Sequence, residues 1–175
     1  GGMVMSLETG RADGIVVDAV WSEGNNAERF NSSPVSGGVK ITRSRGVTVR
    51  NSTMRGNLGP GLWLDESVYD MTVVGNDLRT NSGHGASLEI SAKALFADNV
   101  VQGNGGFGVK VNNTSDVAIW NNTFVGNNRS INIVQDARRY GDGSPGKDPR
   151  YPNDPTMTWV LGPVTVRNNV IAAQP

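Results

Sequence analysis

The chain has 175 residues, with 16 basic and 16 acidic side chains, a formal net charge of +0 and no cysteine. The balanced charge gives no basic surface for nucleic acid and no polybasic segment for a membrane surface, so neither is expected as a partner, and the missing cysteines exclude disulfides and thiolate metal sites. The length fits a single domain, and no apolar stretch approaches the roughly 20 residues of a membrane-spanning helix.

Residues 1–38 show no regular pattern. Ile15, Val16 and Val17 form a short apolar run that is typical of a strand, and residues 22–36 are rich in Ser, Asn and Gly, as loops are. The start, Gly1-Gly2-Met3, has neither the basic segment nor the apolar core of a signal peptide. We interpret residues 1–38 as an irregular first coil and a loop that lead into a repeat.

The repeat occupies residues 39–135. A turn of the form Asn-x-Gly-x-Gly, as in residues 57–61, 81–85 and 104–108, precedes an alternating apolar strand, and a second alternating strand follows. Corresponding apolar residues are separated by 23, 24, 23 and 22 positions; they are Ile41, Leu64, Leu88, Val111 and Ile133. A period of this length indicates a solenoid.

The residue types indicate which solenoid is formed. Alternation of Val, Ile and Leu predicts strands, and the intervening Gly and Asn predict turns. The fixed Leu frame of leucine-rich repeats is absent, and the coil length is too variable for a hexapeptide helix. We therefore predict an all-β fold, a right-handed parallel β-helix of about six coils.

Asparagines recur at two positions of the repeat. One column holds Ser52, Asn76, Asn99, Asn122 and Asn169, and the other holds Asn57, Asn81, Asn104 and Asn127. Successive coils stack at about 4.8 Å, so like residues become neighbours and their amides can bond to one another. We predict two asparagine ladders with a structural role.

The repeat is interrupted at residues 136–163. This insertion is rich in charged, aromatic and proline residues, and the last strands follow at residues 164–175. A long loop of this kind is often functional, so either a substrate-side loop or a packing loop is expected. No cap follows the last strand, which suggests a segment of a longer protein or association of chains end to end. The whole of residues 1–175 is predicted to form one β-helix domain.

One outward strand face concentrates chemistry-bearing residues. Its first column is Lys40, Trp63, Ser87, Lys110 and Asn132, and the next is Thr42, Asp65, Glu89, Asn112 and Val134. The stacking places Asp65 beside Glu89 on the adjacent coil, with Lys110 diagonal to Glu89. We expect Trp63 to be exposed as an aromatic plane for a sugar ring, and His84 lies in the turn before this face.

Two adjacent carboxylates have three interpretations. They can act as general acid and base, or as nucleophile, on a glycosidic bond, and their repulsion raises one pKa. They can hold a hard cation such as calcium, although we predict no specific metal site. They can also be ordinary surface charges paired with Lys93 and Lys110.

The candidate site residues fall into two groups. The catalytic candidates are Glu89 or Asp65 as acid or base, Lys110 as charge stabiliser or base, and His84 as supporting donor. The candidates for substrate binding are Trp63, Asn112 and Asn132 on the face, and Arg138, Arg139 and Tyr140 on the insertion that flanks it.

The Asn-rich repeat resembles the pectin lyase-like right-handed β-helix superfamily over residues 39–171. Gly83-His84-Gly85-Ala86-Ser87 is similar to a stretch of polygalacturonases in which the histidine supports catalysis. The resemblance carries over to His84 and loosely to Lys110, whereas Gly59-Pro60 stands where that family has paired aspartates.

The resemblance implies a secreted or cell-surface protein that binds a polysaccharide or oligosaccharide. If the protein is an enzyme, it is expected to cleave or modify the polysaccharide as a lyase, hydrolase or epimerase. The alternative is a non-catalytic structural, adhesive or glycan-binding module.

Overall fold

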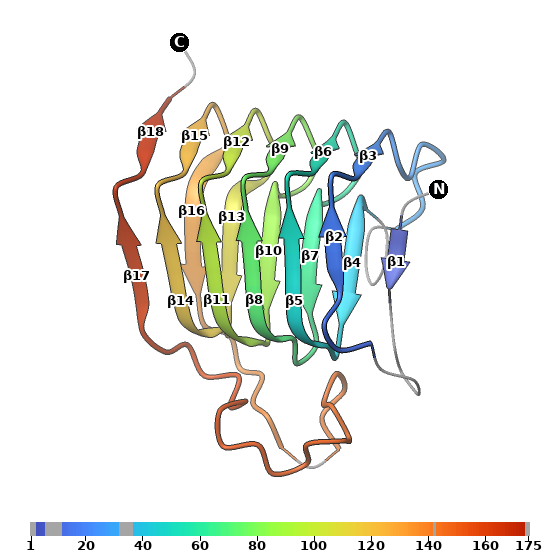
Figure 1. Cartoon of the computed structure of the whole chain (residues 1–175), viewed down its shortest axis with the longest axis vertical. Coiled ribbons are helices and arrows are strands. Elements are labelled where there is room, and N and C mark those ends of the chain that lie inside the picture. Colours follow the sequence, from blue (N-terminus) through green and yellow to red (C-terminus); the bar gives the residue numbers. More distant parts are fainter. Residues whose placement is uncertain (1–2, 6–11, 32–36, 142, 174–175) are drawn as a thin grey trace.

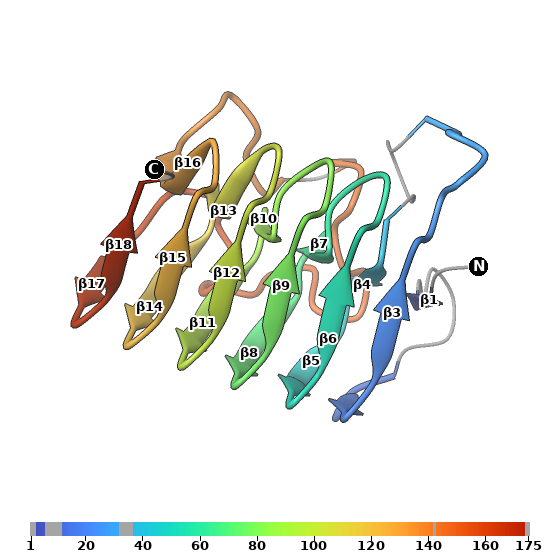
Figure 2. The same ribbon diagram turned by 90° about the horizontal axis from the view of Figure 1, so that it is seen from above.

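The computed structural model describes residues 3–5, 12–31, 37–141 and 143–173. These residues form eighteen strands that wind into a solenoid with three parallel sheets of six strands each (Figures 1 and 2). None of them belongs to a helix long and apolar enough to cross a membrane. The predicted all-β parallel solenoid is confirmed.

Each coil contributes one strand to every sheet. Sheet A contains, in spatial order, β1 (Met3–Met5), β4 (Val39–Thr42), β7 (Leu62–Asp65), β10 (Ala86–Glu89), β13 (Phe107–Asn112) and β16 (Arg129–Val134). Sheet B contains β2 (Val16–Asp18), β5 (Arg45–Arg50), β8 (Tyr69–Val74), β11 (Ala92–Ala97), β14 (Ser115–Trp120) and β17 (Val164–Arg167). Sheet C contains β3 (Trp21–Glu23), β6 (Thr53–Arg55), β9 (Asp77–Arg79), β12 (Val100–Gln102), β15 (Thr123–Val125) and β18 (Val170–Ala172).

The strands pair in the predicted phase. Ile41 lies beside Leu64, Leu64 beside Leu88, and Leu88 beside Val111. Each sheet has six strands, but only about four turns have the predicted length near 23 residues, which is fewer than the six regular coils that we predicted. The turns at the two ends are longer because they carry insertions: Met5 pairs with Ile41, a step of 41 − 5 = 36, and Ile119 pairs with Val166, a step of 166 − 119 = 47.

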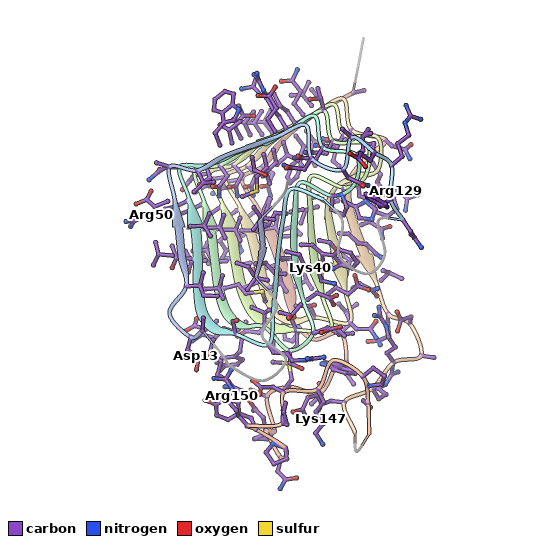
Figure 3. All side chains as sticks on the ribbon, turned by 90° about the vertical axis from the view of Figure 1, so that its right-hand side faces the viewer. Asp13, Lys40, Arg50, Arg129, Lys147 and Arg150 are labelled. Atoms are coloured by element: carbon purple, nitrogen blue, oxygen red, sulfur yellow. The ribbon has the colours of Figure 1, made fainter. Side chains whose placement is uncertain are left out.

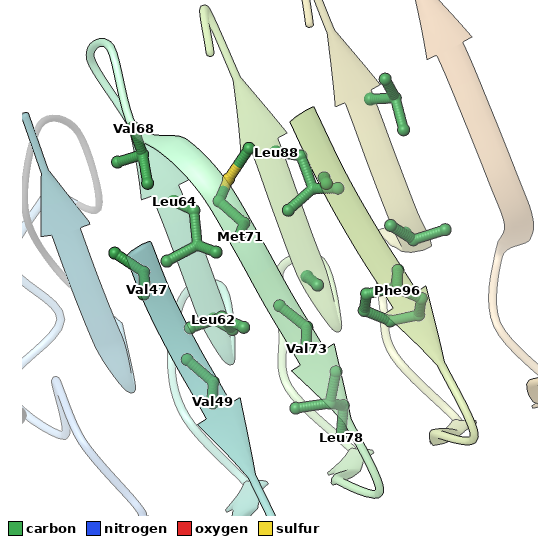
Figure 4. Close-up of a cluster of buried hydrophobic side chains, with 14 of the residues drawn as sticks. Val47, Val49, Leu62, Leu64, Val68, Met71, Val73, Leu78, Leu88 and Phe96 are labelled. Carbon is green, nitrogen blue, oxygen red and sulfur yellow. The ribbon is translucent and has the colours of Figure 1, made fainter. Parts of the chain in front are cut away.

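The inward side chains of all three sheets form one continuous core. Figure 4 shows valine, leucine, methionine and phenylalanine side chains from successive coils stacked in the interior. Leu64, Leu88 and Phe96 are completely buried. Full burial of such a side chain contributes about 1.5–3 kcal/mol, so stacking of like positions is the main source of stability.

Both predicted asparagine ladders are present at the bends. Asn76 donates its backbone and amide N–H groups to the Asn99 Oδ1 atom at 3.0 Å each, and Asn99 repeats the pattern with Asn122. The second ladder also runs through the predicted columns and gains one rung, Asn25, whose amide donates to Asn57.

The insertion between β16 and β17 packs along the bends that join sheet A to sheet B. It leaves the last coils, runs back toward the first coil and returns (Figure 1), and its Arg150 lies near Asp13 at the base of the solenoid (Figure 3). Ser67 donates to the Gly146 carbonyl at 2.9 Å. A small apolar cluster holds the insertion against the solenoid. Its buried members are Ile90, Ala92, Met157 and Trp159.

Candidate functional site

The outer face of sheet A carries the predicted pair of carboxylates. Because Leu64 pairs with Leu88, the next residues, Asp65 and Glu89, lie on adjacent strands on the same side of the sheet. The diagonal position of Lys110 is also confirmed, since Lys110 pairs with Ser87. The face is more closed than expected, because both carboxylates are buried.

Asp65 is held in an ion pair on this face. Its carboxylate lies 2.8 Å from the Lys40 Nζ atom, and both side chains are almost fully covered. Burial raises the pKa of Asp65 to about 6, because loss of water outweighs the attraction of Lys40; the charges of Glu89 and Glu66 raise it further. Asp65 therefore exchanges a proton near neutral pH.

Glu89 is bound by three donors from three different segments. It accepts hydrogen bonds from Arg138 Nη2 at 2.6 Å, Trp63 Nε1 at 3.1 Å and Asn112 Nδ2 at 3.2 Å. Arg138 also binds Asp136, and this guanidinium holds the pKa of Asp136 well below its usual range. The insertion therefore reaches the carboxylate face through Arg138 and through Asp136, which accepts a hydrogen bond from Asn112 Nδ2 at 3.3 Å.

Two expectations about this face are corrected. Trp63, which we expected to be exposed, is half-buried because its indole N–H binds Glu89 and Lys40 Nζ lies 3.7 Å from the ring centroid. The expected surface pairing with Lys93 is wrong, since Lys93 pairs with Asp70. Asp65 and Glu89 use Lys40 and Arg138 instead.

Polar atoms at the centre of the face have unused bonding capacity. The Ser87 Oγ and Asn112 Oδ1 atoms are buried, and neither has a hydrogen-bond partner in the described part of the chain. Buried polar atoms in native proteins are nearly always paired with protein, water or ligand. The Ser87 and Asn112 side chains are therefore incompletely bonded inside this face.

A pocket of about 380 Å³ opens between the end of this face and the insertion. Its lining consists of Asp65, Glu66, Ile90, Arg138, Arg139, Ser144, Pro145 and Trp159. Ile90 adopts a φ of 37°, which is strained for a β-branched residue, and Met157 and Trp159 pack against it. The Trp159 indole N–H is buried without a partner among the described residues.

His84 lies at the bend between sheet C and sheet A rather than against the carboxylates. Its ring stacks on Phe107 with centroids 4.8 Å apart, and its Nδ1 atom accepts the Phe107 N–H at 3.0 Å. Burial, and then the charge of Lys110, lower the pKa of His84. The neutral ring therefore carries its proton on Nε2 as a donor.

The remaining predicted residues are spread around the site. Lys110 is half-exposed beside Ser87, and Asn132 accepts a hydrogen bond from Arg129. Arg139 lines the pocket and donates to the Asp136 and Arg138 carbonyls. Tyr140 lies inside the insertion, where its hydroxyl donates to the Tyr151 carbonyl at 2.7 Å and its ring meets Trp159 edge-on.

Three residues of the site escaped the prediction from sequence. Lys40 pairs with Trp63 and Thr42 pairs with Asp65, so Lys40 is the diagonal neighbour of Asp65. The two columns of outward residues were sufficient to predict this contact. Asp136 and Trp159 belong to the insertion, whose path the repeat does not determine. No group of three or more acidic, histidine or cysteine side chains within the described ranges is placed to hold a metal ion.

Comparison with known proteins identifies a family but no close relative. No curated protein and no solved structure gives a significant match. The family model described as right handed beta helix region matches residues 7–137, which is well over half of the chain. The chain therefore belongs to the right-handed β-helix family.

Proposed function

We propose that this β-helix protein binds an extended polysaccharide along the outer face of sheet A and performs acid–base chemistry on it. The observation that carries the proposal is the buried Asp65 beside Glu89, with a pKa of about 6. A carboxyl group with this pKa is partly protonated near neutral pH, and general acid catalysis needs such a group.

The surroundings of the carboxylates suit a sugar chain. The face extends over successive strands, and Trp63 offers an apolar ring edge between them. The adjoining pocket of about 380 Å³ has room for a sugar unit. Arg138 and Arg139 add positive charge at one wall. We infer a secreted or cell-surface location, where such chains occur.

The residues of this face have roles that their environments favour. Asp65 would donate a proton to the bridging oxygen, and Glu89, held by Arg138, would act as the partner carboxylate. Lys110 would stabilise developing negative charge or act as base, whereas His84 lies around the bend from the carboxylates and has no role in this step. These roles fit hydrolase, lyase or epimerase chemistry, all of which move a proton at the sugar.

A non-catalytic glycan-binding or structural module is the second candidate. The observation that favours it is that both carboxylates already have cationic partners, Lys40 for Asp65 and Arg138 for Glu89. Such pairs can simply stabilise a buried polar face. This candidate predicts saturable binding of a polysaccharide with no product.

A polysaccharide screen separates the two candidates. Acidic and neutral polysaccharides are incubated with the protein, with and without calcium, and both unsaturated products and new reducing ends are followed. We expect Glu89→Gln and Asp65→Asn to lower turnover by about a hundredfold or more while circular dichroism is unchanged. Asp98→Asn, at an exposed carboxylate, is the matched control. Full activity of Glu89→Gln would exclude the assigned role.

A further inference from the structure

A second, larger pocket lies around the bend from the carboxylate face. It has a volume of about 470 Å³ and is lined by Asn26, Arg29, Phe30, Leu58, Gly59, Pro60, Ser82, Gly83 and His84. Its lining residues come from the loop after β3 and from the bends that precede β7 and β10. No carboxylate among the described residues lines it, which separates it chemically from the Asp65 site.

The loop that forms one wall is anchored to the solenoid. The Asn26 Nδ2 atom donates to the Phe30 carbonyl at 2.8 Å and to the Leu58 carbonyl at 2.7 Å. The Leu58 N–H bonds to the Asn25 carbonyl, and the Arg29 N–H to the Asn26 carbonyl. Arg29 adopts a φ of 60°, a conformation uncommon for a residue with a side chain. The wall is therefore a built feature that presents Arg29 and Phe30.

Phe30 and His84 give the pocket two rings. Phe30 is 70% exposed, although it is fixed by the anchored turn. The fourth position of the repeated turn is Pro60, His84 and Phe107 in successive coils. His84 stacks on Phe107, and the pocket begins where Pro60 replaces the planar ring. A ring-shaped ligand can therefore extend this stack by one step over Pro60.

Two side chains of the pocket, Arg29 and His84, present hydrogen-bond donors. The Arg29 guanidinium has neither an ion pair nor a hydrogen bond within the described part of the chain. His84 offers Nε2–H, because its Nδ1 atom is occupied by the Phe107 N–H. Burial lowers the pKa of His84, the charge of Lys110 lowers it further and the charge of Glu89 opposes this, so the ring is a neutral donor. Such a site selects a ligand rich in acceptors, and a guanidinium binds a planar anion through two parallel bonds.

We propose that this pocket binds a sugar ring that carries an anionic substituent, a carboxylate or a sulfate. The ring packs against His84 and Phe30, and the anion binds Arg29. The pocket is too large for a bare anion, and the exposed aromatic faces match the apolar faces of a sugar ring. This inference goes beyond the proposed function, because the second pocket binds without any reaction at Asp65.

Titration of the full chain with small probes tests the proposal. The probes are a uronic acid trisaccharide, a sulfated trisaccharide, the matching neutral trisaccharide and a nucleoside monophosphate, with Kd from calorimetry and contacts from backbone amide shifts. We expect Arg29→Gln to weaken the preferred anionic trisaccharide about tenfold or more and to leave the neutral one unchanged. Phe30→Ala should weaken all three trisaccharides.

Matched controls keep the result interpretable. Arg167→Gln and Trp21→Ala remove an exposed arginine and an exposed aromatic that do not line the pocket, and both should bind as the parent chain does. The amide shifts should fall on the residues that line this pocket and not on Asp65 or Glu89, so failure of the acid–base proposal would remain separate. The proposal is overturned if Arg29→Gln and Phe30→Ala bind like the controls, or if the nucleotide binds more tightly than either anionic sugar.

Discussion

Asp65 shows how one buried carboxyl group balances opposing effects. Removal from water favours its neutral form, and the Lys40 ammonium at 2.8 Å favours its charged form. The removal from water prevails, so the pKa is raised from 3.8 to about 6. A proton is therefore bound more tightly in the folded protein than in the unfolded chain.

This shift predicts a pH dependence of stability. Between the unfolded value of 3.8 and about 6, the folded state binds more protons, so the contribution of Asp65 is greatest below this window and is lost as pH rises through it. The free energy of unfolding of the parent chain minus that of Asp65→Asn should fall by at most about 3 kcal/mol between about pH 4 and about pH 7. Urea unfolding at several pH values measures it.

The control for this prediction is a carboxylate whose pKa shifts the other way. Arg45 and Thr156 lower the pKa of Asp154 despite partial burial, so the same difference for Asp154→Asn should rise with pH at the acidic end. Parallel stability curves for the parent chain and Asp65→Asn across the range would contradict the assignment.

The period of the repeat is sufficient to predict which residues are neighbours on this face. It placed Asp65 beside Glu89 and Lys110 diagonal to Glu89, because strand register follows from the spacing of the inward residues. It could not predict their partners. The Trp63 indole lies toward Glu89, and Arg138 arrives from an insertion without periodicity, so both contacts depend on side-chain and loop conformation.

At the scale of elements, side chains add to the backbone hydrogen bonds that join the bends of successive coils. Residues in the left-handed region recur at the bends, as Arg43, Glu66, Ile90 and Asn113 do between sheets A and B. Each ladder asparagine bonds both to the asparagine of the next coil and to a carbonyl group of the preceding coil. They therefore fix the bend and the coil spacing together.

Asn81→Ala should destabilise the solenoid strongly. The Asn81 Oδ1 atom accepts from the Asn57 backbone and amide, and its Nδ2 atom donates to the Met54 carbonyl, all in the interior. Loss of the amide leaves buried groups unpaired, at an expected cost of about 2–5 kcal/mol. Denaturant unfolding measures it, and the exposed Asn128→Ala is the control within about 0.5 kcal/mol of the parent. Equal stability of the two variants would contradict a structural ladder.

The elements differ in how well the sequence determines them. The ladder was predicted wherever the repeat is regular, but the Asn25 rung was missed because 32 residues separate it from Asn57. The insertion was located between the correct strands, yet its course was not predicted. Arg150 binds Asp13 and the Arg43 carbonyl at the other end of the molecule, and Arg45 pairs with Asp154. Contacts at such distances along the chain carry no periodic signal.

At the scale of the whole molecule, the solenoid is a stack in which the strands of each coil pair only with those of the neighbouring coils. The inward residues of the last coil are therefore covered on one side alone. Three residues of the last coil pair with fully buried residues of the coil before it, yet they are themselves largely exposed. They are Ile133, Val166 and Ile171, which are 41%, 45% and 58% exposed. The strands β16, β17 and β18 stand at the edges of the three sheets. An apolar surface edged by unpaired strands favours association.

We predict that this end of the chain self-associates, as the sequence suggested. The mass from light scattering should rise with protein concentration, and sulfate should strengthen the effect because apolar burial drives it. The double variant Val166→Lys/Ile171→Lys should stay monomeric, since a lysine at each edge position opposes burial. Val100→Lys is the matched control. Val100 is as exposed as Val166, but it lies on the outer face of β12, a strand in the middle of its sheet. The Val100→Lys variant should therefore associate like the parent chain. If the parent chain keeps a single monomer mass at every concentration, then the open coil is stable in water, and its three exposed residues do not form an interface between copies.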